Sequence, residues 1–87
     1  MSSLSSLMFK ISNMVSSAEC ISDFRVFPVA ATADAPAHIR VEYTLMTDDD
    51  KDTEAAERLF GRIEEAHGLS MFYVGSIGCK YRIAWTI

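Results

Sequence analysis

The 87-residue sequence lacks an apolar run of the about 20 residues that a membrane-spanning helix needs. It also lacks a basic segment followed by an apolar one at its start, because residues 1–6 are uncharged and four of them are serine. We therefore expect no membrane association, no secretory signal and a cytoplasmic protein. Hydrophobic residues make up 49% of the chain, too many for a disordered protein. Residues 1–87 are thus expected to form a single small domain.

Paired cysteines are missing as well. Cys20 and Cys79 lie far apart, and neither belongs to a Cys-x-x-Cys motif. In a reducing compartment such cysteines are mostly small buried apolar residues. Together with His38 and His67 they offer the ligand types of a zinc site but not its paired spacing. We expect no disulfide, no metal and no cofactor.

Sequence signatures of catalysis are absent too. No serine lies in a Gly-x-Ser-x-Gly elbow. The glycine-containing segment Gly75 to Gly78 has no lysine and no helix start behind it, so it predicts a hairpin turn between two strands and not a phosphate-binding loop. The sequence therefore predicts a protein that is not an enzyme.

An aspartate run partly matches a calcium-binding loop. Asp48, Asp50 and Asp52 occupy its first three ligand positions. The loop then needs a glycine and, at its end, a bidentate acid, where this sequence has Thr53 and Leu59. The run is more typical of a helix start, since its oxygens accept hydrogen bonds from free N–H groups and its charge favours the positive end of the helix dipole.

Two segments alternate between apolar and polar residues as half-buried strands do. The first runs from Ile39 to Met46. The second runs from Cys79 to Ile87 and predicts that the chain ends inside its own core. The residues expected on the buried faces of the two strands are Ile39, Val41, Tyr43, Leu45, Cys79, Tyr81, Ile83, Trp85 and Ile87.

Helical spacing marks two other segments. Residues 4–18 carry apolar side chains at helical intervals, although Phe9 interrupts the pattern and residues 7–11 also alternate as a strand would. We favour the helix. A second helix is predicted from Asp50 to His67, ended by Gly68. Its buried stripe is Ala56, Leu59, Phe60 and Ile63.

The remaining segments complete an α+β fold. Phe24 to Val29 is expected to be a strand, and its Pro28 favours an edge position or a bulge. A loop follows to Ala37, and Ser70 to Val74 is another strand. The order is αββαββ, with an antiparallel sheet of about four strands and helices on one face. If the first segment were a strand, the order would approach the ferredoxin-like pattern βαββαβ.

Negative charge is concentrated in one segment. The chain carries a net charge of −4, and the eight acids and three bases from Asp48 to Glu65 give −5. Such a field repels phosphate backbones and attracts basic surfaces, so direct binding of nucleic acid is disfavoured. The aromatic residues Tyr43, Tyr81 and Trp85 are expected in the core and not on a base-stacking platform.

The outer side of the second helix is the candidate interaction site. Gly61 lies on that side, where core packing does not explain it and where glycine costs about 1 kcal/mol relative to alanine. A partner could approach closely at such a notch; the alternative is a glycine that is merely tolerated at a weak position of the helix. The candidate partner-binding residues are Asp48, Asp49, Asp50, Asp52, Glu54, Glu57, Arg58, Gly61, Glu64 and Glu65.

These features predict a non-enzymatic protein-binding domain, an inhibitor that occupies a basic, nucleic-acid-binding type of surface on a partner protein. In size, acidity and lack of catalytic residues the chain resembles small phage-encoded inhibitors, anti-CRISPR proteins among them. The resemblance lies in composition, and no residue role is transferred from it. The alternative is a small-molecule-binding or oligomer-forming domain with a ligand between sheet and helix. The sequence leaves open whether the chain is a monomer or a homodimer.

Overall fold

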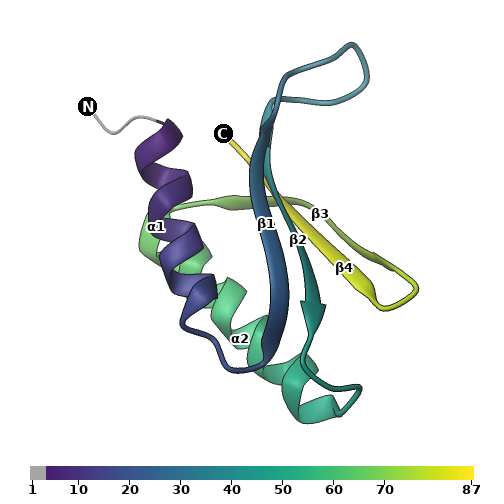
Figure 1. Ribbon diagram of the computed structural model, residues 1–87. Coiled ribbons are helices and arrows are strands. Elements are labelled where there is room, and N and C mark those ends of the chain that lie inside the picture. Colours follow the sequence, from purple (N-terminus) through teal and green to yellow (C-terminus); the bar gives the residue numbers. More distant parts are fainter. Residues whose placement is uncertain (1–3) are drawn as a thin grey trace.

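The computed structural model describes residues 4–87 and has an α+β fold of order αββαββ. Both helices lie on one face of a four-stranded antiparallel sheet with strand order β1-β2-β4-β3 (Figure 1). The predicted fold is thereby confirmed, and the ferredoxin-like alternative is wrong because the first segment is a helix. The elements are α1 (Leu4–Ser16), β1 (Ile21–Val29), β2 (His38–Leu45), α2 (Asp50–His67), β3 (Ser70–Ile77) and β4 (Lys80–Thr86).

The apolar side of helix α1 faces the core, where Ile11 and Val15 are both buried. Phe9, the residue that interrupts the helical pattern, is 67% exposed. Its side chain therefore lies outside the core, and the alternation of residues 7–11 has no structural counterpart. No helix within residues 4–87 is both long and apolar enough to cross a membrane.

Helix α2 has the predicted bounds because both of its ends are capped. The Asp49 side chain accepts a hydrogen bond from the Lys51 backbone N–H at 3.0 Å, which identifies Asp49 as the N-cap. At the other end Gly68 adopts the left-handed conformation with φ 61°. The backbone N–H of Leu69 then donates to the Glu64 carbonyl at 3.0 Å, which satisfies one of the helix's free carbonyls.

The core fills the space between the helices and β2 and β4. Cross-strand neighbours on this face are Ile39 with Trp85 and Val41 with Ile83. The prediction that Leu59, Phe60, Ile63, Ile83 and Trp85 are buried is confirmed, whereas Tyr43 and Tyr81 are half-buried. The two tyrosine rings stack with centroids 5.5 Å apart at the edge of the core.

The end of the chain differs from the prediction. Cys79 is exposed because it lies in the two-residue turn with Gly78, whose φ is 64°. Ile87 follows the last strand and is also exposed. The expectation that both side chains belong to the core is therefore wrong, and among the two cysteines only Cys20 is buried.

Two strand boundaries also differ. Strand β3 continues to Ile77, so the turn expected at residues 75–78 comprises only residues 78–79. Gly75 lies inside the strand, where a Cβ atom would come 2.6 Å from the hydroxyl oxygen at the end of the Tyr73 side chain. Strand β1 begins at Ile21, three residues before the expected start, and a register shift between Ile21 and Asp23 disrupts the alternation there.

The two edge strands of the sheet are β1 and β3. Pro28 lies on β1, so its predicted edge position is confirmed. Helix α1 packs on β1, whereas α2 packs on α1 and β2. The hairpin of β3 and β4 extends away from the helices (Figure 1). Strand β3 is thus left largely uncovered, with seven of its eight residues exposed.

Candidate protein-binding surface

The predicted acidic residues come together on α2 and the segment that leads into it. We use the name acidic face for the exposed acidic side chains of this region that form no ion pair or hydrogen bond with another side chain within residues 4–87. At 100° per residue its helical members lie on one side of α2 together with Gly61. Within residues 4–87 no ion pair involves any of its carboxylates. The acidic face consists of Asp48, Asp50, Glu54, Glu57 and Glu65.

Three other predicted site residues have structural tasks. Asp49 caps α2. The Asp52 carboxylate accepts hydrogen bonds from the Thr47 backbone N–H at 2.9 Å and from the Thr47 hydroxyl at 2.7 Å. These bonds fix the segment between β2 and α2 at the point where the helix begins. The presence of an acid at positions 49 and 52 is therefore partly accounted for by these structural hydrogen bonds.

Glu64 is the third acid with a structural task. Its Oε2 accepts a hydrogen bond from the indole Nε1 of Trp85 at 2.8 Å. Trp85 is 0% exposed, and a buried indole N–H needs an acceptor. Sequence periodicity places Glu64 on the outer side of α2, but it does not show that the side chain reaches back to β4.

Gly61 lies between the acidic face and a groove. A Cβ atom at this position would meet nothing within 4 Å, so neither packing nor backbone conformation requires glycine. We call α2–β3 groove the two adjoining cavities of about 260 and 250 Å³ between α2 and β3, which share Tyr43, Glu57 and Val74. Gly61 lines the first of them. The predicted notch is thus an opening above an apolar groove with an acidic rim.

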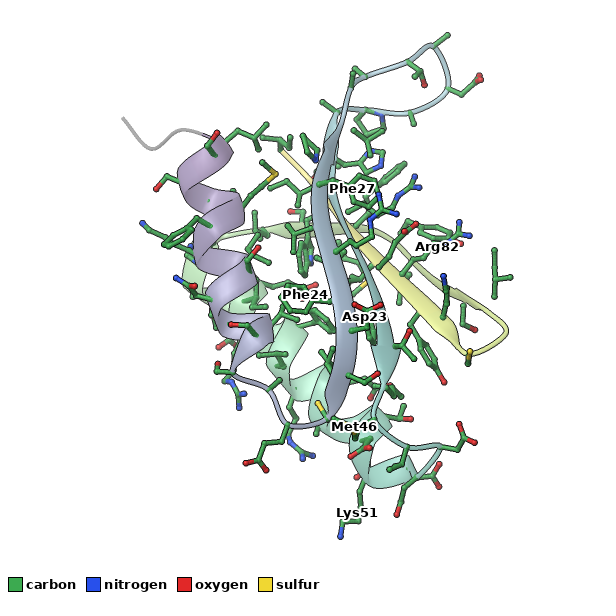
Figure 2. The ribbon with its side chains drawn as sticks, viewed as in Figure 1. Asp23, Phe24, Phe27, Met46, Lys51 and Arg82 are labelled. Atoms are coloured by element: carbon green, nitrogen blue, oxygen red, sulfur yellow. The ribbon has the colours of Figure 1, made fainter. Side chains whose placement is uncertain are left out.

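A larger cavity of about 590 Å³ lies at the opposite flank of α2. Arg58, the remaining predicted site residue, is exposed and lines it together with Cys20, Lys51 and Asp52. Figure 2 shows Met46 and Lys51 near the N-terminal end of α2. Burial raises the pKa of the Cys20 thiol. The thiol therefore stays protonated and is a poor nucleophile near neutral pH.

The face of the sheet away from the helices carries a different set of residues, which we call the open face. Figure 2 shows Phe24 on the helix side of β1 and Asp23 and Phe27 on the other side, with Arg82 beyond them. Two charged side chains on neighbouring strands pair with Glu42 there: Arg25 at 3.6 Å and Arg82 at 3.9 Å.

Aromatic residues on the open face were not identified from the sequence. One row across the sheet runs from Phe27 through Arg40 and Ala84 to Tyr73. The Arg40 guanidinium carbon lies 5.8 Å from the centre of the Phe27 ring. The cross-strand register was the missing information, because Phe27 is opposite Arg40 and not opposite a core residue.

His38 lies at one end of the open face and is 3% exposed. Its Nδ1 is 2.8 Å from the Pro36 carbonyl oxygen, so Nδ1 carries the hydrogen and donates. Its ring packs on Phe72 with centroids 5.0 Å apart. A histidine enclosed in this way is not placed to exchange protons with a substrate.

Within residues 4–87 no group of three or more His, Cys, Asp or Glu side chains is placed to hold a metal ion. The chain matches no protein-family model, no curated protein and no solved structure with which it was compared. Its function is therefore inferred from the surfaces described above.

Proposed function

We propose that this chain is a non-enzymatic protein-binding domain that docks the acidic face of α2 on a basic surface of a partner protein. The observation that carries the proposal is the set of five exposed carboxylates, free of ion pairs within residues 4–87, around the space left open at Gly61. Opposite charge on the partner would speed association and fix the orientation of docking.

A nucleic-acid-binding surface is the kind of basic surface that fits best. Such surfaces present lysine and arginine side chains to a row of phosphates. A row of carboxylates on a helix competes for the same side chains without being a nucleic acid. The chain would then act in the cytoplasm as an inhibitor, as small phage-encoded anti-defence proteins such as anti-CRISPR proteins do.

Charge reversal with a matched control tests this proposal. We expect Glu54→Lys combined with Glu57→Lys to slow association with a partner captured from the source cell at least tenfold at low salt. The control combines Glu19→Lys with Asp34→Lys, two exposed acids outside the acidic face, and changes the net charge by the same amount. Wild-type binding should weaken as salt rises, because exposed charges are screened.

A third variant separates contact from charge. Gly61→Arg should abolish docking by bulk and charge while α2 stays folded, since the position has open space around it. Association rates measured for all three variants decide the question. If the control slows association as much as the reversed helix, the effect is one of net charge and the acidic face is not the interface.

A second candidate function is binding of a small molecule in the α2–β3 groove. The combined volume of its two cavities falls within the roughly 300–1,000 Å³ range of ligand pockets. Phe60, Met71 and Ile83 provide an apolar lining, and Glu57 and Glu64 lie at the rim. A thermal shift with metabolites that is present in the wild type and lost in Gly61→Trp would support this function.

A further inference from the structure

Strand β3 is unusual in exposing large apolar side chains on both faces of the sheet. It contributes five of the nine large apolar side chains that are exposed within residues 4–87. None of its eight residues is charged, and none is proline. Clustered apolar exposure of this kind is rare on monomeric proteins and marks an interaction surface. The five residues are Met71, Phe72, Tyr73, Val74 and Ile77.

The backbone of β3 is available as well. The strand pairs only with β4, so the groups on its outer side have no strand partner. Proteins usually protect such an edge with charged side chains, proline or a covering element. The other edge, β1, has these devices in Asp23, Arg25, Pro28 and helix α1. On β3 the one such device is a register shift between Met71 and Tyr73.

We propose that β3 pairs antiparallel with β3 of a second copy of this chain. The strand that covers β3 must bring apolar side chains to both faces of the sheet, and β3 itself meets that requirement. Because β3 is uncharged, a copy related by a two-fold axis places no like charges opposite each other. A basic peptide would instead bring lysine or arginine against Met71, Val74 and Ile77. The product is a continuous eight-stranded sheet.

Different side chains of β3 would meet their counterparts on each face of the joined sheet. On the helix side Met71 and Val74 are neighbours of Trp85 and Ile83 in the register, so their counterparts from the second copy extend the apolar core outward. On the open side Tyr73 and Ile77 are neighbours of Ala84 and Lys80, and their counterparts from the second copy would add apolar contacts there. The pairing also brings the two copies of α2 to the same side of the joined sheet.

Two properties of the dimer follow. Pairing of one eight-residue strand is a small contact compared with the about 800 Å² per partner of a standard interface, so the dimer should depend on concentration. The two acidic faces repel each other, so salt should strengthen the dimer by screening. Docking of the acidic face on a basic partner has the opposite salt dependence, which makes the two proposals separable.

Sedimentation equilibrium from micromolar to millimolar protein tests the pairing. We expect the wild-type mass to approach that of a dimer as concentration rises, and more readily at high salt. Val74→Lys should weaken dimerisation at least tenfold, because lysine on an edge strand opposes strand addition. The matched control is Met46→Lys, since Met46 is 55% exposed and lies outside β3, whereas Val74 is 60% exposed. We expect the control to dimerise like the wild type.

If Val74→Lys does not fold, Ile77→Lys tests the same edge of the sheet, because Ile77 also lies on β3 and is exposed. Amide hydrogen exchange adds a local readout: β3 should become protected as protein concentration rises, while β1 should not change. A wild type that stays monomeric at all concentrations overturns the proposal. So does a dimer that Val74→Lys, Ile77→Lys and Met46→Lys weaken equally, since its interface would then lie elsewhere.

Discussion

The two halves of the chain have the same order of elements but not the same degree of closure. Each half is a helix followed by a hairpin, with β2 and β4 in the centre of the sheet and β1 and β3 at its edges. Strand β1 is covered by α1, whereas β3 has no helix of its own. The two halves thus repeat the order of elements but not the burial of the edge strand, which is covered in the first half and open in the second.

The position of α2 explains this asymmetry. Its aromatic residue Phe60 lies 4.8 Å from the ring of Tyr43 on β2 and 5.9 Å from that of Trp85 on β4, measured between ring centroids. The buried stripe of α2 therefore rests over the centre of the sheet, and α1 fills the space over β1. The two helices pack against each other on this face and do not extend over β3, the edge strand next to β4.

The largest effect expected from this comparison is on stability. Trp85→Ala should lower the free energy of unfolding by about 3–5 kcal/mol, because Trp85 is 0% exposed at the centre of the core. Val74→Ala, one strand away, should change it by no more than about 0.5 kcal/mol. Urea unfolding followed by far-UV circular dichroism measures both. Equal losses in the two variants would mean that β3 is covered in the folded monomer.

The sequence allows the fold to be predicted to a large extent, because most of its signals are local. The caps at Asp49 and Gly68 set the bounds of α2, and strict alternation identifies β2 and β4. Boundaries are missed where a register shift breaks alternation, as at Ile21. They are also missed where a glycine lies inside a strand and not in a turn, as at Gly75.

The candidate site is less predictable because it depends on contacts between distant residues. Sequence identifies the acids of α2 as one group, but it does not separate Glu64, bonded to Trp85, from the exposed Glu65. Nor does it show that Phe27 meets Arg40 on the open face. Both facts follow from cross-strand register and packing, which no local pattern encodes.

A change in stability of intermediate size should distinguish acids of α2 with a structural role from acids that are only exposed. Glu64→Leu removes the acceptor of the Trp85 indole N–H and should lower the free energy of unfolding by about 1–3 kcal/mol. Its neighbour Glu65 is exposed, so Glu65→Leu should leave stability unchanged within about 0.5 kcal/mol. Trp85 fluorescence during urea unfolding reports both variants. Two variants of equal stability would contradict a structural role for Glu64 and return it to the acidic face.

The smallest effect concerns Gly61 and has the opposite sign. Gly61→Ala should raise the free energy of unfolding by about 0.5–1 kcal/mol, because alanine restores helix propensity and its Cβ meets no atom within 4 Å. Gly68→Ala is the control and should lower it, since φ is 61° there and a side chain is strained. Thermal unfolding of the two variants, compared at equal protein concentration, measures the difference. A stability gain combined with weaker partner binding would mean that glycine at position 61 serves docking at the expense of the helix. A loss of stability in Gly61→Ala would instead mean that the added Cβ meets other atoms, and therefore that the α2–β3 groove is narrower at Gly61 than the structure shows.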